Sequence, residues 1–343
     1  MKKKLRSTQK DVALKAGVTQ ASVSLALSNH YSIPAETRDR IQQIARELSY
    51  YPDPYLSGLC AYRKQNLSPT FQATIVWLSN WHRPSTSRWI GVNSGYFQGA
   101  SARTQELGYK LEEIALRSPN MTPARMEQIL LARNIHGIIL PPQPEPGTKL
   151  DFHFDKFSVV TFGYTLVEPQ LHTITLHHHR SMELLLRKLK ALGYKRPGLA
   201  LLTSEDSRTD RIWSAAFWSE QRHLSPRQRV ALLTDEAMDQ ATIMRWYRRC
   251  RPDVVVTSHI EVYQWLTESG LDIPGDVGFA LLTIPLSNTF YSGIWQNLPE
   301  TGAKAVDFLV DMIHRDERGI PAIRSNLLID GSWMDGQTVR RQE

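Results

Sequence analysis

One stretch of the sequence, Gly17 to Asn29, carries hydrogen-bonding side chains of a kind that is unusual for a solvated helix. It reads GVTQASVSLALSN, and its polar groups are the short hydroxyls and amides of Thr, Ser and Gln. Helices that face water usually carry the long charged side chains of Lys and Glu. Hydroxyl and amide groups both donate and accept hydrogen bonds. The composition therefore raises the question of what such a helix face meets.

Three consecutive histidines, His177 to His179, are candidate metal ligands. The ligands of one ion must converge, but consecutive residues of a strand point to opposite faces, so only His177 and His179 could share one. We therefore interpret the run as a solvated loop or as the lining of a cleft, in preference to a metal site.

The sequence holds no recognisable catalytic or cofactor-binding motif. GxSxG, Walker, HExxH and GxGxxG patterns do not occur, and Cys60 and Cys250 have no recognisable partner arrangement. We predict that the protein is not an enzyme and that it has no cofactor and no metal.

Three short helices in the first 50 residues must position the polar stretch. The first is expected over 8 to 16 and ends at Gly17, which can adopt the left-handed turn that closes a helix. Thr19 can cap the second, and Pro34 opens the third at its first helical position. The apolar stripe of the third helix is Ile41, Ile44, Ala45 and Leu48. Helix, short glycine turn and helix form the spacing of a helix-turn-helix.

From residue 73 onward, apolar runs alternate with amphipathic segments. Strand and helix alternating over about 270 residues predict parallel sheets covered on both faces, and two α/β lobes with a cleft between them. Amphipathic helices are expected at 181 to 194 and 261 to 270. The expected strands are 73 to 78, 136 to 140, 157 to 162, 198 to 202, 253 to 257 and 277 to 282.

Positive charge is concentrated at the start of the chain. Residues 1 to 65 hold eleven Lys or Arg and five Asp or Glu, a net charge of +6 out of +7 for the whole chain. All nine tryptophans lie beyond them, from Trp77 to Trp333. A small basic module on a nearly neutral body is expected of a nucleic-acid-binding head, and a solvated basic tail is the alternative.

The start of the chain does not predict export or membrane insertion. The polar residues after Met-Lys-Lys-Lys contain no apolar signal segment, and no run of about 20 apolar residues follows anywhere. The two isolated cysteines fit a reducing compartment. We expect a cytoplasmic protein.

The order of these motifs is similar to that of a known family. TQKDVALKAGVTQASVSLAL is followed by IPAETRDRIQQIARELSYYPDP, and looser matches continue to ETGAKAVDFLVDMI at 300 to 313. The chain resembles the lactose repressor/galactose repressor (LacI/GalR) family of bacterial transcription regulators. The resemblance implies a homodimer with a helix-turn-helix head (1–50), a hinge helix and linker (51–65) and a two-lobed, periplasmic-binding-protein-like core for effector binding and dimerisation (66–343).

The resemblance also implies which head residues meet double-stranded DNA. Gln20 and Ala21 fall on positions that read bases in the major groove, where Gln20 could pair with an adenine edge. Thr19, Ser22 and Ser24 are disposed to contact phosphate. The remaining DNA-facing positions are Thr8, Leu25, Ser28 and Tyr55. Leu25 replaces an Arg that reads guanine in many relatives, and it could touch a thymine methyl or pack internally.

In the hinge, the resemblance implies a second contact, because two hinge helices of a dimer press a leucine pair into the minor groove. Leu59 is the expected wedge and Leu56 the alternative. Gly58 weakens this helix by roughly 1 kcal/mol relative to Ala. Such a helix suits a segment that becomes ordered on DNA.

Between the lobes, the resemblance implies a site for a small-molecule effector, often a sugar or a purine. The expected contact residues are Trp81, Trp89, Arg211, Trp213, His259, Thr283 and Gln296. Relatives carry Asn-Asp where this chain has Ser258-His259, and Asp where it has Thr283. These departures imply an effector unlike those of the best-known members, or none.

Together these observations predict a sequence-specific transcription regulator, in the simplest case a repressor, that binds a pseudo-palindromic operator as a dimer. A small-molecule binding protein or an enzyme on the same two-lobed core is the alternative. The basic head argues against both, and the lack of an export signal argues against an exported carrier.

Overall fold

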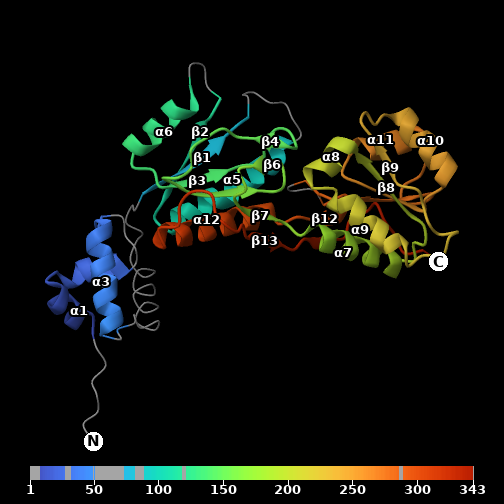
Figure 1. Ribbon diagram of the computed structural model, residues 1–343. Coiled ribbons are helices and arrows are strands. Elements are labelled where there is room, and N and C mark those ends of the chain that lie inside the picture. Colours follow the sequence, from blue (N-terminus) through green and yellow to red (C-terminus); the bar gives the residue numbers. More distant parts are fainter. Residues whose placement is uncertain are drawn as a thin grey trace, which may run out of the picture.

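The protein consists of a helical head followed by two α/β lobes (Figure 1). The structure is a computed structural model that describes residues 8–27, 32–48, 50, 73–81, 89–117, 121–285 and 289–342, and residues 89–93 in their backbone alone. The predicted hinge, 51 to 65, lies outside the described residues. Its boundaries, and with them the three-part division of the chain, therefore stay a prediction.

The head forms the three predicted helices, α1 (Gln9–Ala16), α2 (Gln20–Leu27) and α3 (Ala35–Glu47). Gly17 has a φ of 67° and donates its N–H to the carbonyls of Ala13 and Leu14, which ends α1 as predicted. The Thr19 hydroxyl accepts the N–H of Ser22 at 3.1 Å and caps α2. The prediction for Pro34 was wrong by one position, since it precedes α3 as the N-cap residue.

Small and branched apolar side chains fill the head interior. Because the three helices are short, each contributes only two or three fully buried residues to a common core. The buried residues are Val12, Ala13, Ala16, Val23, Ala26, Ile41 and Ala45.

The N-terminal lobe has a six-stranded sheet in the order β13-β7-β5-β3-β1-β2, parallel throughout. Its strands are β1 (Thr74–Ser79), β2 (Lys110–Ala115), β3 (Gly137–Leu140), β5 (Ser158–Phe162), β7 (His172–Leu176) and β13 (Asn326–Ile329). A two-stranded sheet adds β4 (Thr148–Lys149) and β6 (Leu166–Glu168).

Helices cover both faces of this sheet, which follows from the alternation of side chains along each strand. Ile75 and Trp77 point toward α5 (Trp89–Glu106) and α12 (Leu298–His314). Val76 and Leu78 point to the other face, toward α6 (Pro123–Ala132) and an aromatic loop. The helices α5 and α12 pack so closely that a methyl group at Gly302 would collide with the carbonyl oxygen of Tyr96. Glycine at this position therefore permits the close approach.

The C-terminal lobe repeats this plan with the strand order β14-β12-β11-β10-β8-β9. All neighbours are parallel except β12 and β14. The strands are β8 (Pro197–Leu202), β9 (Leu233–Asp235), β10 (Val254–Thr257), β11 (Gly278–Leu281), β12 (Ser292–Trp295) and β14 (Ser332–Met334). The helices α7 (His178–Ala191) and α9 (Ile212–Gln221) cover one face, and α10 (Gln240–Cys250) and α11 (Glu261–Glu268) cover the other.

The chain passes between the lobes three times. The crossings lie between β7 and α7, between β12 and α12, and between β13 and β14. All six strands and both core helices that the sequence predicted are confirmed, as is the two-lobed α/β core. Among the described residues, no helix is both long and apolar enough to cross a bilayer.

Candidate nucleic-acid interface and inter-lobe cleft

The polar face of α2 lies on the outside of the head. Thr19, Gln20, Ala21 and Ser24 are exposed, whereas the intervening Val23 is buried. Local sequence accounts for this orientation, because Val23 and Ala26 are the apolar residues that turn inward. The first turns of α2 therefore present short side chains on the outside of the head.

Two predicted contact residues are only half exposed. The hydroxyls of Ser22 and Thr19 lie 2.9 Å apart, so Ser22 takes part in the cap of α2. Leu25 is half-buried, which fits partial packing within the head. Ser28, Tyr55, Leu56 and Leu59 lie outside the described residues, and their roles stay predictions.

The beginning of α1 lies beside that of α2, since the amide of Gln20 donates to the side-chain oxygen of Gln9 at 3.4 Å. Thr8 starts α1 with a capping box: its backbone N–H and its hydroxyl both donate to Asp11 at 2.7 Å, and its hydroxyl oxygen accepts from the Asp11 N–H. These bonds hold the pKa of the Asp11 carboxyl below its usual value. Thr8 is exposed, but a structural role already occupies its hydroxyl.

Charge in the three-helix body of the head is nearly balanced. The described head residues include five Lys or Arg and four Asp or Glu, a net charge of +1. Lys15 pairs with Glu47 at 2.6 Å, and Arg38 lies 3.6 Å from Asp316 of the N-terminal lobe. Most of the positive charge of residues 1 to 65 therefore belongs to the segments that flank the three helices.

Between the lobes, a loop that follows β3 is held by the ends of neighbouring strands. Trp81, after β1, donates its indole N–H to the Pro142 carbonyl at 2.8 Å. The N–H of Gln143 donates to the Thr165 hydroxyl at 2.7 Å, and the side-chain oxygen of Gln143 accepts from Asn80 at 3.0 Å. The loop is therefore rigidly placed, and one of the predicted cleft residues, Trp81, helps to place it.

Arg208, at the end of α8 (Thr203–Arg208), bridges the two lobes. Its guanidinium donates to the carbonyl oxygens of Pro144 at 2.6 Å and Gln143 at 2.9 Å, both in the N-terminal lobe. Arg208 is buried, and burial lowers its pKa to about 10, against the opposing charges of Glu145 and Glu205. Its two hydrogen bonds join the lobes directly.

A carboxylate lies one helical turn before Arg208. Glu205 is buried, accepts the Ser258 hydroxyl at 2.5 Å, and lies 2.7 Å from the Nε2 of His259. The structure thus brings His259, a predicted cleft residue, together with two charged residues that the sequence interpretation did not name. A usable signal existed, since the run Thr203 to Arg208 places three charges directly after a buried strand.

The other predicted cleft residues occupy varied environments. Trp213 is buried in the core of the C-terminal lobe, with its ring 4.8 Å from that of His178. Gln296 is buried and donates to the Leu282 carbonyl at 2.8 Å, while Thr283 is half-buried. Arg211 is exposed and has a φ of 57°. The side chain of Trp89 lies outside the description.

The histidine run begins a helix, so its interpretation as a solvated loop was wrong. His177 precedes α7 and accepts the N–H of Arg180 at 3.4 Å, whereas His178 is buried and His179 is exposed. Burial, helped by the neighbouring His177, lowers the pKa of His178 to about 3. Within the described ranges no three His, Cys, Asp or Glu residues lie close enough together to hold a metal ion.

Two protein-family models match the chain, one over the head and one over most of the C-terminal lobe together with α12 and β13 of the N-terminal lobe. The model for bacterial regulatory proteins of the lacI family matches residues 8–53, and the model for the periplasmic binding protein-like domain matches residues 186–339. The head thus matches the lacI family. The first match spans the capped α1, the glycine turn and the polar α2, which identifies these elements as a LacI-type DNA-binding head.

Relatives of the LacI family resemble the chain at two levels. The head is 47% identical over 53 residues to the HTH-type transcriptional repressor CytR of Escherichia coli K12, and the match covers 16% of this chain and 16% of CytR. The fold is similar to the lac repressor dimer bound to operator and the anti-inducer ONPF, with 19% identity, 97% and 98% of the two chains covered and a TM-score of 0.54. It is also similar to the transcriptional regulator CelR in complex with cellobiose, with 15% identity, 97% and 100% coverage and a TM-score of 0.54.

Proposed function

We propose that the protein is a sequence-specific DNA-binding transcription regulator, in the simplest case a repressor, that acts as a homodimer in the cytoplasm. The observation that carries this proposal is the exposed polar face of α2 in a LacI-type head. No sequence motif for catalysis supports the enzyme alternative, and the regulators named among its relatives support the DNA-binding one.

In the proposed complex, α2 enters the major groove with its first turn toward the bases. Gln20 and Ala21 are exposed there, and Gln20 is held near Gln9 by a hydrogen bond that can rearrange to an adenine edge. Thr19, whose hydroxyl caps α2, and the neighbouring Ser24 are exposed beside it, on the side of α2 where we place the phosphates. A dimer presents two such helices, which favours a pseudo-palindromic operator.

We further propose that a small molecule in the inter-lobe cleft controls DNA binding, with a sugar as the first candidate. CelR, a structural relative, is known in complex with cellobiose. The contacts of Arg208 with Gln143 and Pro144 join the lobes in the arrangement that the structure shows, and we expect a change of this arrangement to break them. A ligand that favours or disfavours this placement shifts the equilibrium between two arrangements, and its coupling to DNA is reciprocal.

A gel-shift titration of the full-length protein on its own upstream region tests the DNA-binding proposal. The proposal expects a shifted band that random DNA of equal length does not compete away at moderate salt. Exchanging Gln20 for Ala should weaken this preference while leaving the melting temperature unchanged, because the side chain is exposed. Equal affinity for the upstream region and for random DNA would refute the proposal.

Thermal-shift screening of sugars and nucleosides tests the effector proposal separately. A ligand that binds the folded cleft stabilises it by about 2.7 kcal/mol at one hundred times its dissociation constant. A sugar that raises the melting temperature and changes the gel-shift midpoint supports the proposal. Ligands that raise the melting temperature without any change in DNA affinity would contradict it.

A further inference from the structure

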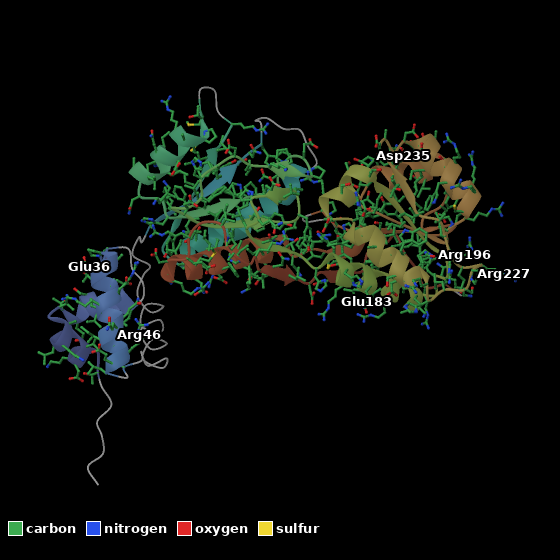
Figure 2. All side chains as sticks on the ribbon, viewed as in Figure 1. Glu36, Arg46, Glu183, Arg196, Arg227 and Asp235 are labelled. Carbon is green, nitrogen blue, oxygen red and sulfur yellow. The ribbon has the colours of Figure 1, made fainter. Side chains whose placement is uncertain are left out.

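The C-terminal lobe carries a group of cations at the end opposite its cleft, which we name the distal basic cluster. It is built by the turn before β8, the loop between α9 and β9, and the end of α10. Figure 2 shows two of its members, Arg196 and Arg227, close together at the end of the molecule that lies farthest from the head. The members are Lys195, Arg196, Arg222, Arg227, Arg229, Arg248, Arg249 and Arg251.

Arg196 holds the three segments of the distal basic cluster together. Its guanidinium donates to the carbonyl oxygens of Arg227, of Cys250 at 2.7 Å and of Arg251 at 3.2 Å. The guanidinium of Arg229 likewise donates to the carbonyls of Leu224 and Arg222. These bonds fix the backbone of the cluster with neutral acceptors, so they organise its positive charge without cancelling it.

Among the described residues, no carboxylate forms an ion pair with a side chain of the distal basic cluster. The nearby Asp253 accepts the backbone N–H groups of Lys195 at 2.6 Å and Arg196 at 2.9 Å. All ion pairs between side chains of the described residues lie elsewhere, for example Arg103 with Asp307 and Arg133 with Glu112 in the N-terminal lobe. Cations carried by neighbouring segments repel one another, which destabilises the fold unless an anion is bound.

Ordinary structural roles account for only part of this charge. Arg248 and Arg249 lie in the last turn of α10, where cations complement the negative end of the helix dipole. Arg196 and Arg229 tie the loops together. Lys195, Arg222 and Arg227 are exposed, and neither hydrogen bonds nor ion pairs of their side chains are found within the described part of the chain. These three side chains have no structural task that requires a charge.

We propose that the distal basic cluster binds the backbone of a second segment of duplex DNA, away from the DNA held by the head. The surface has the composition of a phosphate-binding site, since seven of the eight cations are arginines, whose guanidinium groups match phosphate geometry. Protein-binding surfaces have an apolar core, and protein–DNA interfaces are more polar and more positive. Among the described residues of this lobe, the exposed large apolar side chains are Trp218, one helical turn before Arg222, and Phe290 and Met334, which lie outside the cluster's segments.

This arrangement makes the protein a bridge between two DNA segments. The head lies beside the N-terminal lobe and the cluster lies at the far end of the C-terminal lobe, so one straight duplex does not reach both (Figure 1). The binding is independent of base sequence, because backbone contacts carry no sequence information. The binding also weakens strongly as salt is added. For each phosphate that the protein neutralises, the slope of log K against log salt becomes more negative by about 0.9.

Two charge-matched triple variants of the full chain test the proposal. The cluster variant combines Lys195→Gln, Arg222→Gln and Arg227→Gln. The control combines Lys110→Gln, Arg125→Gln and Lys156→Gln, which removes three exposed cations from the N-terminal lobe. Duplex DNA on beads is loaded with each protein, and the capture of a second, fluorescent duplex of random sequence is measured. The salt dependence of binding to the same random duplex is measured by anisotropy.

The wild type and the control should capture the second duplex, and the cluster variant should lose most of this capture. Its salt slope should fall by about one to three relative to the control. Equal capture by both variants, as expected if the heads alone bridge the duplexes, would overturn the proposal. A second result would also overturn it. If the cluster variant binds polyglutamate less tightly than the control but captures DNA equally well, the surface suits an acidic protein and not DNA. A head variant, Gln20→Asp, tests the cluster independently of the proposed function. It should weaken DNA binding by the head, while binding of random DNA by the cluster should remain.

Discussion

Removal of the Arg208 bridge is the perturbation for which the structure gives the clearest energetic expectation. Hydrogen bonds from a charged donor contribute about 1.5 to 3 kcal/mol each, so the two bonds to Gln143 and Pro144 favour the bridged arrangement by roughly 3 to 6 kcal/mol. Burial of the guanidinium opposes them. Its pKa falls from 12.5 to about 10, which corresponds to a cost of about 3 kcal/mol.

The net stabilisation of the bridged arrangement by Arg208 is therefore about 0 to 3 kcal/mol. In Arg208→Met both bonds and the cost of burying the charge disappear together, so the bridged population should fall by up to about a hundredfold relative to the unbridged one. In Arg208→Lys the charge stays buried but fewer bonds form, since an ammonium lacks the planar fork of a guanidinium. Lys should therefore be at least as damaging as Met, although it conserves the charge.

Electron-spin distance measurements between labels at Lys149 and Ala237, one in each lobe, report the populations once the native cysteines are replaced. The wild type should show one dominant distance, and Arg208→Lys should add a second one that is at least as populated as in Arg208→Met. Arg211→Met is the matched control, because Arg211 is exposed and lies only three residues away. Identical distance distributions in the wild type and in Arg208→Lys would refute this reasoning.

Three further predictions follow from single contacts. Since burial lowers the pKa of His178 from 6.5 to about 3, the unfolded chain binds a proton there first, and stability should be lost progressively as the pH falls from about 6.5 toward 3. At pH 5 the free energy of unfolding should be lower by about 2 kcal/mol. Chemical denaturation should show no such loss in His178→Gln. The same pH dependence in the wild type and the variant would contradict the prediction. Gly302→Ala should lower the melting temperature by several degrees, because its methyl group meets the Tyr96 carbonyl, and an unchanged value would show that α5 and α12 can separate. Thr19→Ala should destabilise the head by about 1 kcal/mol through loss of the α2 cap, with Thr19→Ser as the conservative control that retains it.

The head was predictable because its signals are local. Glycine after α1, a hydroxyl before α2 and proline before α3 act on their immediate neighbours, and the structure places all three where they can do so. The six predicted strands share this property, since buried parallel strands are continuous apolar runs. Two of the strands that were not predicted, β9 and β14, are short strands at sheet edges, and partial exposure gives them a weaker apolar pattern.

The cleft was less predictable because its residues meet through the tertiary fold. Arg208 and Gln143 are separated by a lobe crossing, and no periodicity of the sequence brings them together. The net charge of the chain was misleading for a related reason. A body of nearly neutral total charge conceals the distal basic cluster, because acidic residues elsewhere in the body balance its eight cations in the sum.

Selection of binding sites from random duplexes by the full-length protein tests the central proposal most directly. The account predicts enrichment of one pseudo-palindromic site with two related half-sites, and Gln20→Ala should relax the preference at one base pair of each half-site, at a cost of about 1 to 3 kcal/mol. A wild-type selection that yields no enriched site, or a site whose half-sites are unaffected by Gln20→Ala, would contradict the proposal that the polar face of α2 reads DNA.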